Sequence, residues 1–285
     1  MKIDLHAHTT ASDGILPPDE LIKLALSKDV KVLAISDHDT VEGIPQAFSY
    51  AAGKDIELIA ATELSIEYKP GTFHLVGLFV DWQNIELKNK LSWLTERRST
   101  RAERIVEDLA VHGVNISIKE VLKEAGKGVV GKPHVARVLI KRGFAKDMPS
   151  VFKNFLEEGL PGYIPKDKMN FEEAISLIKR AGGIGILAHP ASLGIKDGEA
   201  FLSFLSKLAG NGLDGIEAYS DMHTPEMTDF YIKAAKSLNL LISGGSDYHG
   251  DKGEEIGCYD KVNPIPASLY QPIKEYAAIM REKNC

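Results

Sequence analysis

Seven short apolar segments, separated by amphipathic stretches, recur along the chain. They are apolar at consecutive positions and rich in Val, Ile and Leu, which is typical of strands buried on both faces, as in a parallel sheet. Such segments occur at residues 2–5, 32–36, 57–61, 73–79, 184–188, 215–218 and 240–243. The pattern therefore predicts seven strands in an α/β protein.

The stretches between these strands carry helix signals. A Pro-Pro pair at residues 17–18 precedes an i, i+3, i+4 apolar pattern, and Asn170 with Glu173 resembles a capping pair. Thr224, followed by proline, opens another helix. Strands that alternate with helices predict βα units with right-handed crossovers. Seven strands favour a (β/α)7 barrel over an open sheet, although the sequence alone leaves closure open.

One region lacks strand signals. From about Trp93 to Ile164 the chain is helical in pattern and rich in charge. We interpret residues 96–164 as a helical insertion domain of ordinary small-domain size between two barrel strands. The predicted barrel domain then consists of residues 1–95 and 165–285.

Composition limits the class of protein. Hydrophobic residues make up 44% and charged residues 26% of the 285 residues, as in a globular protein with a sizeable core. The net charge of −6 argues against a general nucleic-acid coat, while a local basic cleft remains compatible with it. Cys258 and Cys285 form no Cys-x-x-Cys pattern, so we expect neither disulfides nor a zinc–thiolate site. Since no leader-like or membrane-spanning apolar run is present, we expect a soluble cytoplasmic protein without a membrane partner.

Side chains that bind metals stand where the predicted strands end. Because active sites of βα barrels lie at the rim formed by the carboxyl ends of the strands, these side chains should converge. His74 fits this pattern least well, since it precedes most of its apolar segment. The residues concerned are His6, His8, Asp37, His38, Asp39, Glu63, His74, His189, Asp247 and His249.

Each motif also has an ordinary structural interpretation. The His-x-His pair can be two strand residues on one face, the Asp-His-Asp cluster can cap a helix, and His189 before proline can mark a loop. Together, these interpretations require the same coincidence at strand after strand. We therefore predict a metal centre in which imidazole and carboxylate ligands suit Zn, Mn or Fe. Glu63 is the best placed bridging carboxylate.

These motifs, in this order, resemble the polymerase-and-histidinol-phosphatase (PHP) family over nearly the whole chain. Within the insertion, residues 131–134 and 161–163 resemble one branch of it, the nucleoside 3′,5′-bisphosphate phosphatases and 5′-to-3′ oligoribonucleases. The matching barrel motifs are Asp4-Leu5-His6-Ala7-His8-Thr9, Asp13-Gly14, Ser36-Asp37-His38-Asp39-Thr40, Glu63, His74, His189-Pro190 and Gly245-Ser246-Asp247-Tyr248-His249.

The resemblance implies a distorted (β/α)7 TIM-like barrel, the PHP fold, that holds three divalent cations. Manganese is commonly implied, with iron or zinc as alternatives. Some relatives have His at the position of Asp13, which leaves the metal preference of its site open. The implied ligand sets are His6, His8, Glu63 and Asp247 for one cation, Glu63, His74 and His189 for a second, and Asp13, His38 and His249 for the third.

The mechanistic hypothesis is hydrolysis by a hydroxide that bridges two cations and attacks phosphorus. Metal coordination lowers the pKa of water from 15.7 to about 7, which supplies a nucleophile at neutral pH. We assign Asp37, His38 and Glu63 to catalysis. The general acid is left open, and Asp37 can instead orient a ligating imidazole.

The insertion is expected to recognise the substrate. Lys132, His134 and Arg137 lie close together in the sequence, His134 and Arg137 can share a helix face, and Arg suits bidentate phosphate contact. A solvated helix N-terminus is the alternative. Lys166, together with Lys168, is a weaker candidate.

Three further features have less specific interpretations. His223 follows the sixth strand and either lines the pocket or precedes the helix cap at Thr224. We interpret the basic residues at 97–104 as exposed helical surface and His112 as a helix C-terminus.

The leading function is hydrolysis of a phosphate ester in a small nucleotide or at an oligonucleotide end. Histidinol-phosphatase-like activity comes next, followed by a metal-dependent amidohydrolase, which can also begin with His-x-His after a first strand. A non-catalytic module that uses metals for stability is the last alternative. The expected partner is a small phosphorylated substrate, and no obligate protein partner is evident from the sequence.

Overall fold

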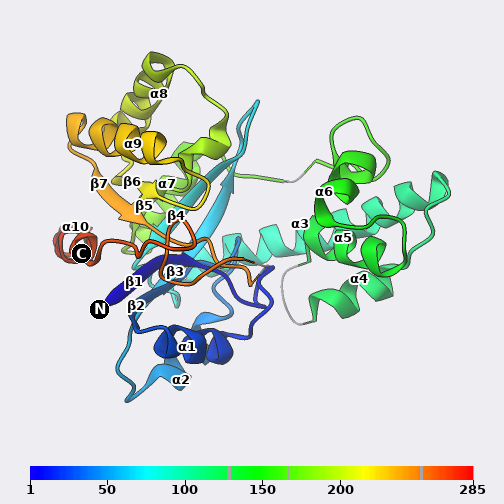
Figure 1. The fold of residues 1–285 in the computed structure, drawn as a ribbon, viewed down its shortest axis with the longest axis horizontal. Coiled ribbons are helices and arrows are strands. Elements are labelled where there is room, and N and C mark those ends of the chain that lie inside the picture. Colours follow the sequence, from blue (N-terminus) through cyan, green and yellow to red (C-terminus); the bar gives the residue numbers. More distant parts are fainter. Residues whose placement is uncertain (127–129, 166, 251–252, 285) are drawn as a thin grey trace.

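The computed structural model describes residues 1–126, 130–165, 167–250 and 253–284. Its seven strands lie side by side in sequence order (Figure 1). Every predicted strand is present, and the third continues to Ile66, well past its predicted end. The strands are β1 Lys2–Ala7, β2 Val30–Ile35, β3 Glu57–Ile66, β4 Phe73–Leu78, β5 Ile184–Leu187, β6 Gly215–Tyr219 and β7 Leu241–Gly244.

Strand β4 runs opposite to its neighbours. It pairs antiparallel with both β3 and β5, whereas all other strand pairs in the sheet are parallel. The prediction of a parallel sheet is therefore wrong at this strand. Residues 67–72 connect β3 to β4, and so short a connection allows a hairpin but no crossover helix. Because β4 is reversed, its second residue, His74, lies at the edge where the parallel strands end.

The first strand meets the segment that follows β7. The His8 amide donates to the Tyr248 carbonyl at 2.9 Å, and the Asp247 amide donates to the His6 carbonyl at 3.0 Å. Buried Asp4 accepts hydrogen bonds from the amide and hydroxyl of the residue preceding Asp247. These contacts close the sheet at the carboxyl ends of its strands and give a distorted (β/α)7 barrel, as the resemblance implied.

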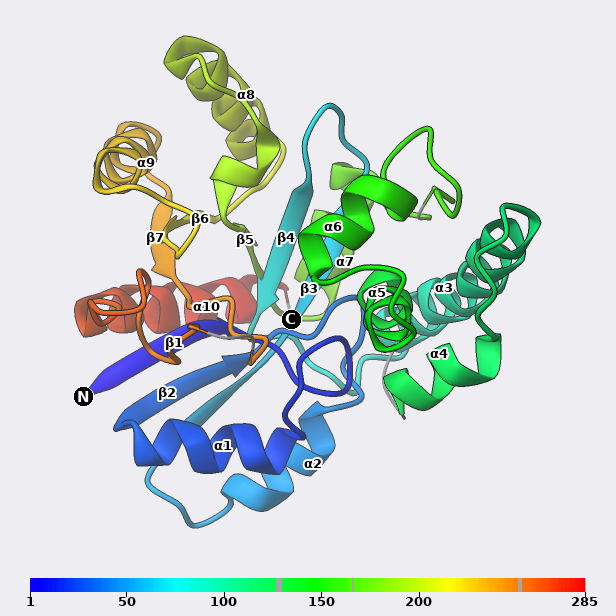
Figure 2. The same ribbon diagram turned by 45° about the vertical axis from the view of Figure 1, so that its right-hand side comes forward.

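Helices cover the outside of the barrel and close its interior. Figure 2 shows α1 and α2 along β1 to β3, and α7 and α9 lie against the strands from β4 to β7. Helix α10 packs Tyr270, Ile273 and Ala277 against inward-facing strand residues such as Ile3 and Val32. The helices are α1 Pro18–Ser27, α2 Ile44–Ala51, α3 Ile85–Val111, α4 Ile118–Ala125, α5 Lys132–Lys141, α6 Met148–Val151, α7 Phe171–Arg180, α8 Gly198–Gly210, α9 Pro225–Ser237 and α10 Tyr270–Asn284, with a π-helix at Phe152–Leu156 and 3₁₀ helices at Pro190–Leu193 and Ala267–Leu269.

The C-terminal half of α3, helices α4 to α6 and the π-helix, here called the helical segment, gather on one side of the barrel (Figures 1 and 2). They share a hydrophobic core of their own. Helix α3 belongs to both parts, because Leu87 and Leu91 pack in the outer barrel core while Ile105 and Leu109 pack in the helical core. The predicted boundary at residue 96 falls inside this continuous helix, and the division into two domains stays a prediction.

The predicted helix ends are present in the structure. Asn170 accepts a hydrogen bond from the Glu173 amide at 2.8 Å, and Thr224 caps α9 in the same way. Helix α3 ends at Val111, so His112 is its C-terminal cap residue. Within the described ranges, no helix combines the length and the apolar character needed to cross a membrane.

Candidate metal centre

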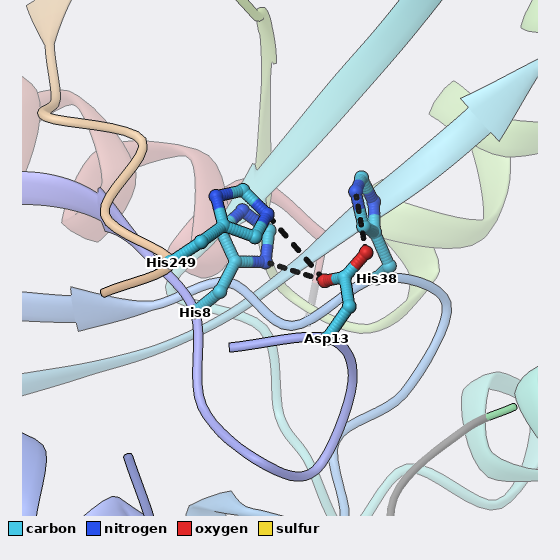
Figure 3. A group of neighbouring side chains, drawn as sticks. All are labelled: His8, Asp13, His38 and His249. Atoms are coloured by element: carbon cyan, nitrogen blue, oxygen red, sulfur yellow. Dashed lines mark ion pairs between the residues drawn. The ribbon is translucent and has the colours of Figure 1, made fainter. Parts of the chain in front are cut away.

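The nine predicted metal ligands converge at the carboxyl rim of the barrel. They form three overlapping groups, in each of which the ligand atoms lie within 4.8 Å of one another. Figure 3 shows the first group, in which the Asp13 carboxylate faces His8 and His249 on one side and His38 on the other. The other groups are His6, Glu63, His189 and Asp247, and then His38, Glu63 and His74.

Glu63, on β3, connects these groups. Its side chain is fully buried. Oε1 lies 2.8 Å from Nδ1 of His74 and 3.0 Å from Nε2 of His189. Oε2 lies 2.8 Å from Nδ1 of His38 and 3.4 Å from Nε2 of His6. A single carboxylate within reach of so many imidazoles fits the bridging position predicted for Glu63.

The grouping differs from the implied ligand sets at three histidines. His189 groups with His6 and Asp247 and not with His74, His38 groups with Glu63 and His74 as well as with Asp13, and His8 groups with Asp13. The resemblance places His8 with His6, but its ring stands between two groups. Nε2 of His8 lies 3.1 Å from Asp247 Oδ1 and 3.4 Å from Glu63 Oε2, and Nδ1 lies 4.0 Å from Asp13 Oδ1. Because either ring nitrogen can face a cation, the assignment of His8 to one cation stays a prediction.

Several buried polar atoms of this cluster have no hydrogen-bond partner within the described residues. They are Nε2 of His6, Nδ1 of His8, Oδ1 of Asp13, Nδ1 of His38 and Oε2 of Glu63. The close contact between Nδ1 of His38 and Oε2 of Glu63 is an ion pair that lacks hydrogen-bond geometry. Buried polar side chains normally have at least one such partner, because leaving one unsatisfied costs about 1–3 kcal/mol. A cation supplies the missing partner for each, and imidazole nitrogen with carboxylate oxygen is a donor set suited to Mn, Fe or Zn.

The buried carboxylates remain ionised. Burial opposes ionisation of Asp13, Glu63 and Asp247, but the surrounding imidazoles hold the pKa of each carboxyl well below its usual range. The centre therefore carries concentrated negative charge when its histidines are neutral, which is what a group of divalent cations requires.

The histidines divide into two classes. Burial opposes protonation of His189 and His249, but nearby carboxylates outweigh it and raise the pKa to about 9 and about 10. The pKa of His6 is raised for the same reason. Burial lowers the pKa of His8 to about 3 and that of His74 to about 4, so both imidazoles are neutral. In the metal-free protein, protons on His6, His189 and His249 offset the negative charge of the carboxylates, and bound cations would take the place of these protons.

Glu217, on β6, supports two ligands and was missed from the sequence. Its carboxylate lies 3.2 Å from Nδ1 of His6 and accepts a hydrogen bond from the His189 amide at 2.8 Å. This contact turns Nε2 of His6 towards Glu63 and Asp247. Carboxylates that orient ligating imidazoles in this way are common behind metal sites. The available signal was a charged residue inside an otherwise apolar strand.

Two of the predicted ligands have unusual backbone conformations. His189 has φ of 22° and Asp247 has φ of 52°, a region that costs a non-glycine residue about 1–3 kcal/mol. Their amides bond to Glu217 and to the His6 carbonyl, which hold this geometry. Gly245 permits the same close packing, because a Cβ there would overlap the Cβ of His6. Strain at the rim is consistent with a functional site.

Asp37 holds the loop between His8 and Asp13. Its buried carboxylate accepts hydrogen bonds from the amide and hydroxyl of Thr9, at 2.8 and 2.7 Å, and from the Ser12 hydroxyl at 2.6 Å. Burial raises its pKa to about 6. The described hydrogen bonds of the Asp37 carboxylate thus go to this loop, behind the ligand groups. Its predicted catalytic role, and the alternative that it orients a ligating imidazole, stay predictions.

A cavity of about 920 Å³ adjoins the metal centre. Asp13, His38 and His74 form part of its wall, and the β3–β4 hairpin and the helical segment supply much of the rest. Its volume falls in the range of roughly 300–1,000 Å³ that is usual for ligand pockets. A ligand in this space therefore contacts the metal centre and the helical segment together.

The cavity wall carries basic and aromatic side chains beside the acidic Glu67 and Glu158. Arg101, Lys132 and Lys168 line it, as do Phe152 and Tyr163. The prediction that Arg101 belongs to an exposed surface is wrong, because this half-buried side chain faces the cavity and donates to the Ile164 carbonyl at 2.7 Å. Helical periodicity could not show that Ile164 lies against this face of α3.

Comparison with known proteins identifies the family. The PHP domain profile matches residues 4–126, which include His6, His8, Asp13, His38, Glu63 and His74. The chain is 34% identical over 248 residues to the 5′-3′ exoribonuclease Rnm of Salmonella typhimurium, with 86% of this chain and 84% of that protein covered. The chain belongs to the PHP domain family.

A further relative and a solved structure match along almost their entire length. The 3′,5′-nucleoside bisphosphate phosphatase of Chromobacterium violaceum is 30% identical over 284 residues, which cover 98% of each chain. A solved structure from the same species, described as an amidohydrolase with bound sulfate and no metal, has a TM-score of 0.86 at 28% identity, with 98% of this chain and 97% of that one covered. As a PHP family member, this chain is a hydrolase of phosphate esters, and its ligand cluster fits divalent metal ions.

The predicted substrate-binding residues of this PHP protein lie in different environments. Lys132 lines the cavity, donates to the Leu156 carbonyl at 2.5 Å and lies 4.5 Å from the Tyr163 ring centre. Burial, followed by the nearby Arg101 charge, lowers the pKa of Lys132 to about 8. Arg137 reaches the metal loop, where Nη2 donates to the Asp13 carbonyl at 2.9 Å.

The two histidines predicted to contact substrate are buried and bonded within the protein. Nδ1 of His134 accepts from the Gly131 amide at 3.0 Å and so caps α5. Nδ1 of His223 donates to the Ala218 carbonyl at 2.9 Å. Lys166 lies outside the described residues, so its predicted contact stays a prediction.

Proposed function

We propose that this PHP enzyme hydrolyses phosphate esters of nucleotides with three divalent cations, Mn²⁺ being preferred and Fe²⁺ or Zn²⁺ the alternatives. The observation that carries the proposal is the cavity, which is lined both by the metal-centre residues Asp13, His38 and His74 and by Arg101, Lys132 and Lys168. A phosphate ester that these cationic side chains hold is placed against the ligand cluster. The named activities of the relatives, an exoribonuclease and a bisphosphate phosphatase, support a nucleotide as substrate.

The nine rim residues would hold the cations. When bound, the cations lower the pKa of water from 15.7 to about 7 and neutralise charge on the phosphate oxygens. Glu63 would bridge neighbouring cations, and neutral His8 and His74 would coordinate without losing a proton. His38 faces both Glu63 and Asp13, so it stands where two of the ligand groups meet.

Asp37 contributes through the loop that it holds. Its carboxylate fixes Thr9 and Ser12, and these residues join the ligands His8 and Asp13. We therefore assign Asp37 as a positioning residue for the catalytic centre and assign it no direct contact with the reacting phosphate.

Substrate contacts are assigned to the cavity wall. Lys132 and Lys168, with Arg101, would bind a second phosphate, since charge-assisted hydrogen bonds to phosphate are the strong ones. Phe152 and Tyr163 would offer stacking surfaces to a base, and such stacking contributes about 1–3 kcal/mol per base. Sulfate, a tetrahedral anion like phosphate, is bound in the Chromobacterium violaceum structure, which supports an anion site in this fold.

We also infer that residues 96–164 form a substrate-recognition domain, because Arg101, Lys132, Phe152 and Tyr163 all reach the cavity from this range. A cytoplasmic location is proposed from cysteine usage. Cys258 is buried as a free thiol, which suits a reducing compartment.

Three alternatives rank below this function. Histidinol-phosphatase-like hydrolysis uses the same rim but needs no basic helical segment. Amide hydrolysis is kept because the similar Chromobacterium violaceum structure is described as an amidohydrolase. A non-catalytic metal-stabilised module is least favoured, since the rim contains a full set of candidate ligands beside an open cavity.

The proposal is tested with metal-stripped protein reconstituted with Mn²⁺. The substrates are adenosine 3′,5′-bisphosphate, a short 5′-phosphorylated oligoribonucleotide, histidinol phosphate, an aryl phosphate and a small panel of amides. We expect the first two to be hydrolysed with the highest kcat/KM. Preference for histidinol phosphate would overturn the nucleotide assignment, and amide hydrolysis without phosphate release would overturn the reaction class.

A further inference from the structure

We propose that Arg137 is a positioning residue through which the helical segment holds the Asp13 loop ready for a cation. Nη2 of Arg137 donates to the Asp13 carbonyl at 2.9 Å, across 124 positions of sequence. The inference rests on the metal centre of the proposed function and extends it, because it makes the helical segment part of metal binding as well as of substrate recognition.

The Asp13 carboxylate depends on how its own backbone is held. Oδ1 lies 3.4 Å from Nε2 of His249, and Oδ2 lies 3.9 Å from Nε2 of His38, so a small rotation of the loop withdraws it from both (Figure 3). Asp37 fixes the first part of the loop, at Thr9 and at Ser12. Arg137 bonds to the ligand residue itself and so restricts the peptide group next to the coordinating side chain.

The remaining side of the loop is tightly packed. The Gly14 amide donates to the Thr9 carbonyl at 3.0 Å, and the Ile15 amide donates to the His249 carbonyl at 2.8 Å. A Cβ on Gly14 would lie 2.7 Å from backbone atoms of His8. These contacts belong to the barrel, whereas Arg137 comes from another part of the chain and adds a fixed point there.

Helix α5 gives Arg137 a rigid base. Its neighbours Val135, Ala136 and Val138 are buried in the core of the helical segment, and His134 caps the helix at Gly131. The Arg137 side chain is half-buried, and it is not among the described residues that line the cavity. The position of the Arg137 side chain is therefore set by the packing of the helical segment and not by a substrate in the cavity.

This role and the phosphate contact predicted for Arg137 from the sequence differ in what they control. A guanidinium has five N–H donors, so one bond to a carbonyl leaves others available. A phosphate contact would change KM for a bisphosphate, whereas a positioning role would change the affinity of one cation. Loss of groups that orient metal ligands typically lowers metal affinity by about 10–100-fold.

The experiment measures Mn²⁺ binding to metal-stripped protein by titration calorimetry, together with bound Mn per chain after gel filtration. Arg137→Met removes the donor and keeps much of the aliphatic stem, and Arg137→Lys is the conservative variant. Arg142→Met is the matched control, because Arg142 follows the same helix, is 55% exposed and pairs with Glu120. Circular dichroism and thermal melting confirm that each variant is folded.

We expect Arg137→Met to lower the affinity for one Mn²⁺ per chain by about tenfold. Arg137→Lys should recover part of this affinity, and Arg142→Met should bind Mn²⁺ as the wild type does. At saturating Mn²⁺, KM for the bisphosphate should stay within about twofold of wild type. Unchanged Mn²⁺ affinity with a raised KM would overturn the proposal in favour of phosphate contact. An equal loss of affinity for every bound cation would overturn the claim that Arg137 acts locally on the Asp13 loop.

The outcome is separable from that of the proposed function. Metal binding is measured without substrate, so a wild-type protein that hydrolyses no phosphate ester but shows the predicted Mn²⁺ difference supports the positioning role and overturns only the function. If Arg137→Met fails to fold, Arg137→Lys decides the question, and wild-type Mn²⁺ affinity together with raised KM in that variant would contradict the proposal.

Discussion

The barrel rim and the helical segment use charged residues in opposite ways. At the rim, Glu63 is fully buried among imidazoles, and one of its oxygens has no hydrogen-bond partner within the described chain. In the helical segment, Arg142 pairs with Glu120 at 2.6 Å while 55% and 33% of the two side chains remain exposed. Exposed pairs of this kind contribute little to stability, whereas an unsatisfied buried charge is costly.

The difference indicates where function resides. A buried charge cluster in which several ring nitrogens and carboxylate oxygens have no described hydrogen-bond partner is completed by something absent from the chain, and divalent cations are the chemically suitable group. In the helical segment, Arg101 and Lys132 are likewise charged residues that are half-buried, and both face the cavity. Substitution of charged residues that face the cavity or the rim is thus expected to reduce activity far more than substitution of charged residues that face solvent.

The largest effect is expected at the centre of the rim. Glu63→Gln removes a negative charge without changing shape, at the carboxylate that bridges the ligand groups. We expect kcat to fall by more than about 100-fold, because loss of a ligand should exceed the effect of losing a group behind it. Phosphate release and bound Mn per chain are measured on folded protein, and near-normal turnover would refute the bridging assignment.

Metal affinity should depend strongly on pH. In the metal-free protein the pKa of His189 is about 9 and that of His249 about 10, so below these values a cation must displace a proton. Raised imidazole pKa values mean that apparent Mn²⁺ affinity increases with pH, by about tenfold per unit for each displaced proton, and levels off above about pH 10. Calorimetry in buffers of different ionisation enthalpy measures the protons released. An Mn²⁺ affinity that does not change between pH 6 and pH 9 would contradict this account.

Glu217 tests the support behind the ligands. Glu217→Gln weakens the contact with His6 and removes the charge that favours its correct orientation. We expect about tenfold weaker Mn²⁺ binding with little change in the fold. Glu199→Gln, at an exposed position of α8, is the control. If both variants bind Mn²⁺ equally well, Glu217 has no role in orienting the ligand.

Lys132 tests the cavity wall. Lys132→Met should raise KM for adenosine 3′,5′-bisphosphate by about tenfold, because a charge-assisted hydrogen bond contributes about 1.5–3 kcal/mol. An aryl phosphate, which lacks a second phosphate, should be affected much less. Steady-state kinetics on the two substrates shows whether Lys132 contacts the second phosphate, which only the bisphosphate has. The same loss of kcat/KM on both would show that Lys132 acts on the shared phosphate or on the fold.

The smallest effect is expected at the exposed pairs of the helical segment. Glu120→Gln removes the charge that pairs with Arg142, yet the thermal midpoint and kcat/KM should stay close to wild type, since solvent already screens this pair. Differential scanning calorimetry and the bisphosphate assay provide the measurements. A large loss of activity here would remove the contrast between the two regions.

Much of the barrel was predictable because burial on both faces leaves continuous apolar segments. All seven strands follow from this pattern, and so does the placement of His6, His189 and Asp247 at or just beyond strand ends. The direction of β4 did not follow, because apolar runs carry no information on strand direction. The misfit of His74 at the start of its segment was the available sign of a reversed strand.

Other features depend on contacts between distant parts of the chain. Arg101 has the helical spacing of a surface residue, and only the chain that crosses it at Ile164 turns it into a cavity wall. Arg137 reaches Asp13 through the packing of α5, which a local pattern cannot contain. Glu217 sits in an apolar strand, where a single charged residue is too weak a signal to identify its partner His6.

The most direct test of the account is phosphate release from adenosine 3′,5′-bisphosphate as Mn²⁺ is added back to metal-stripped protein in measured equivalents. The account predicts no turnover without metal, a rise with each equivalent and saturation near three per chain, with Glu63→Gln inactive throughout. Turnover that is independent of added metal, or full metal binding without any phosphate release, would contradict it.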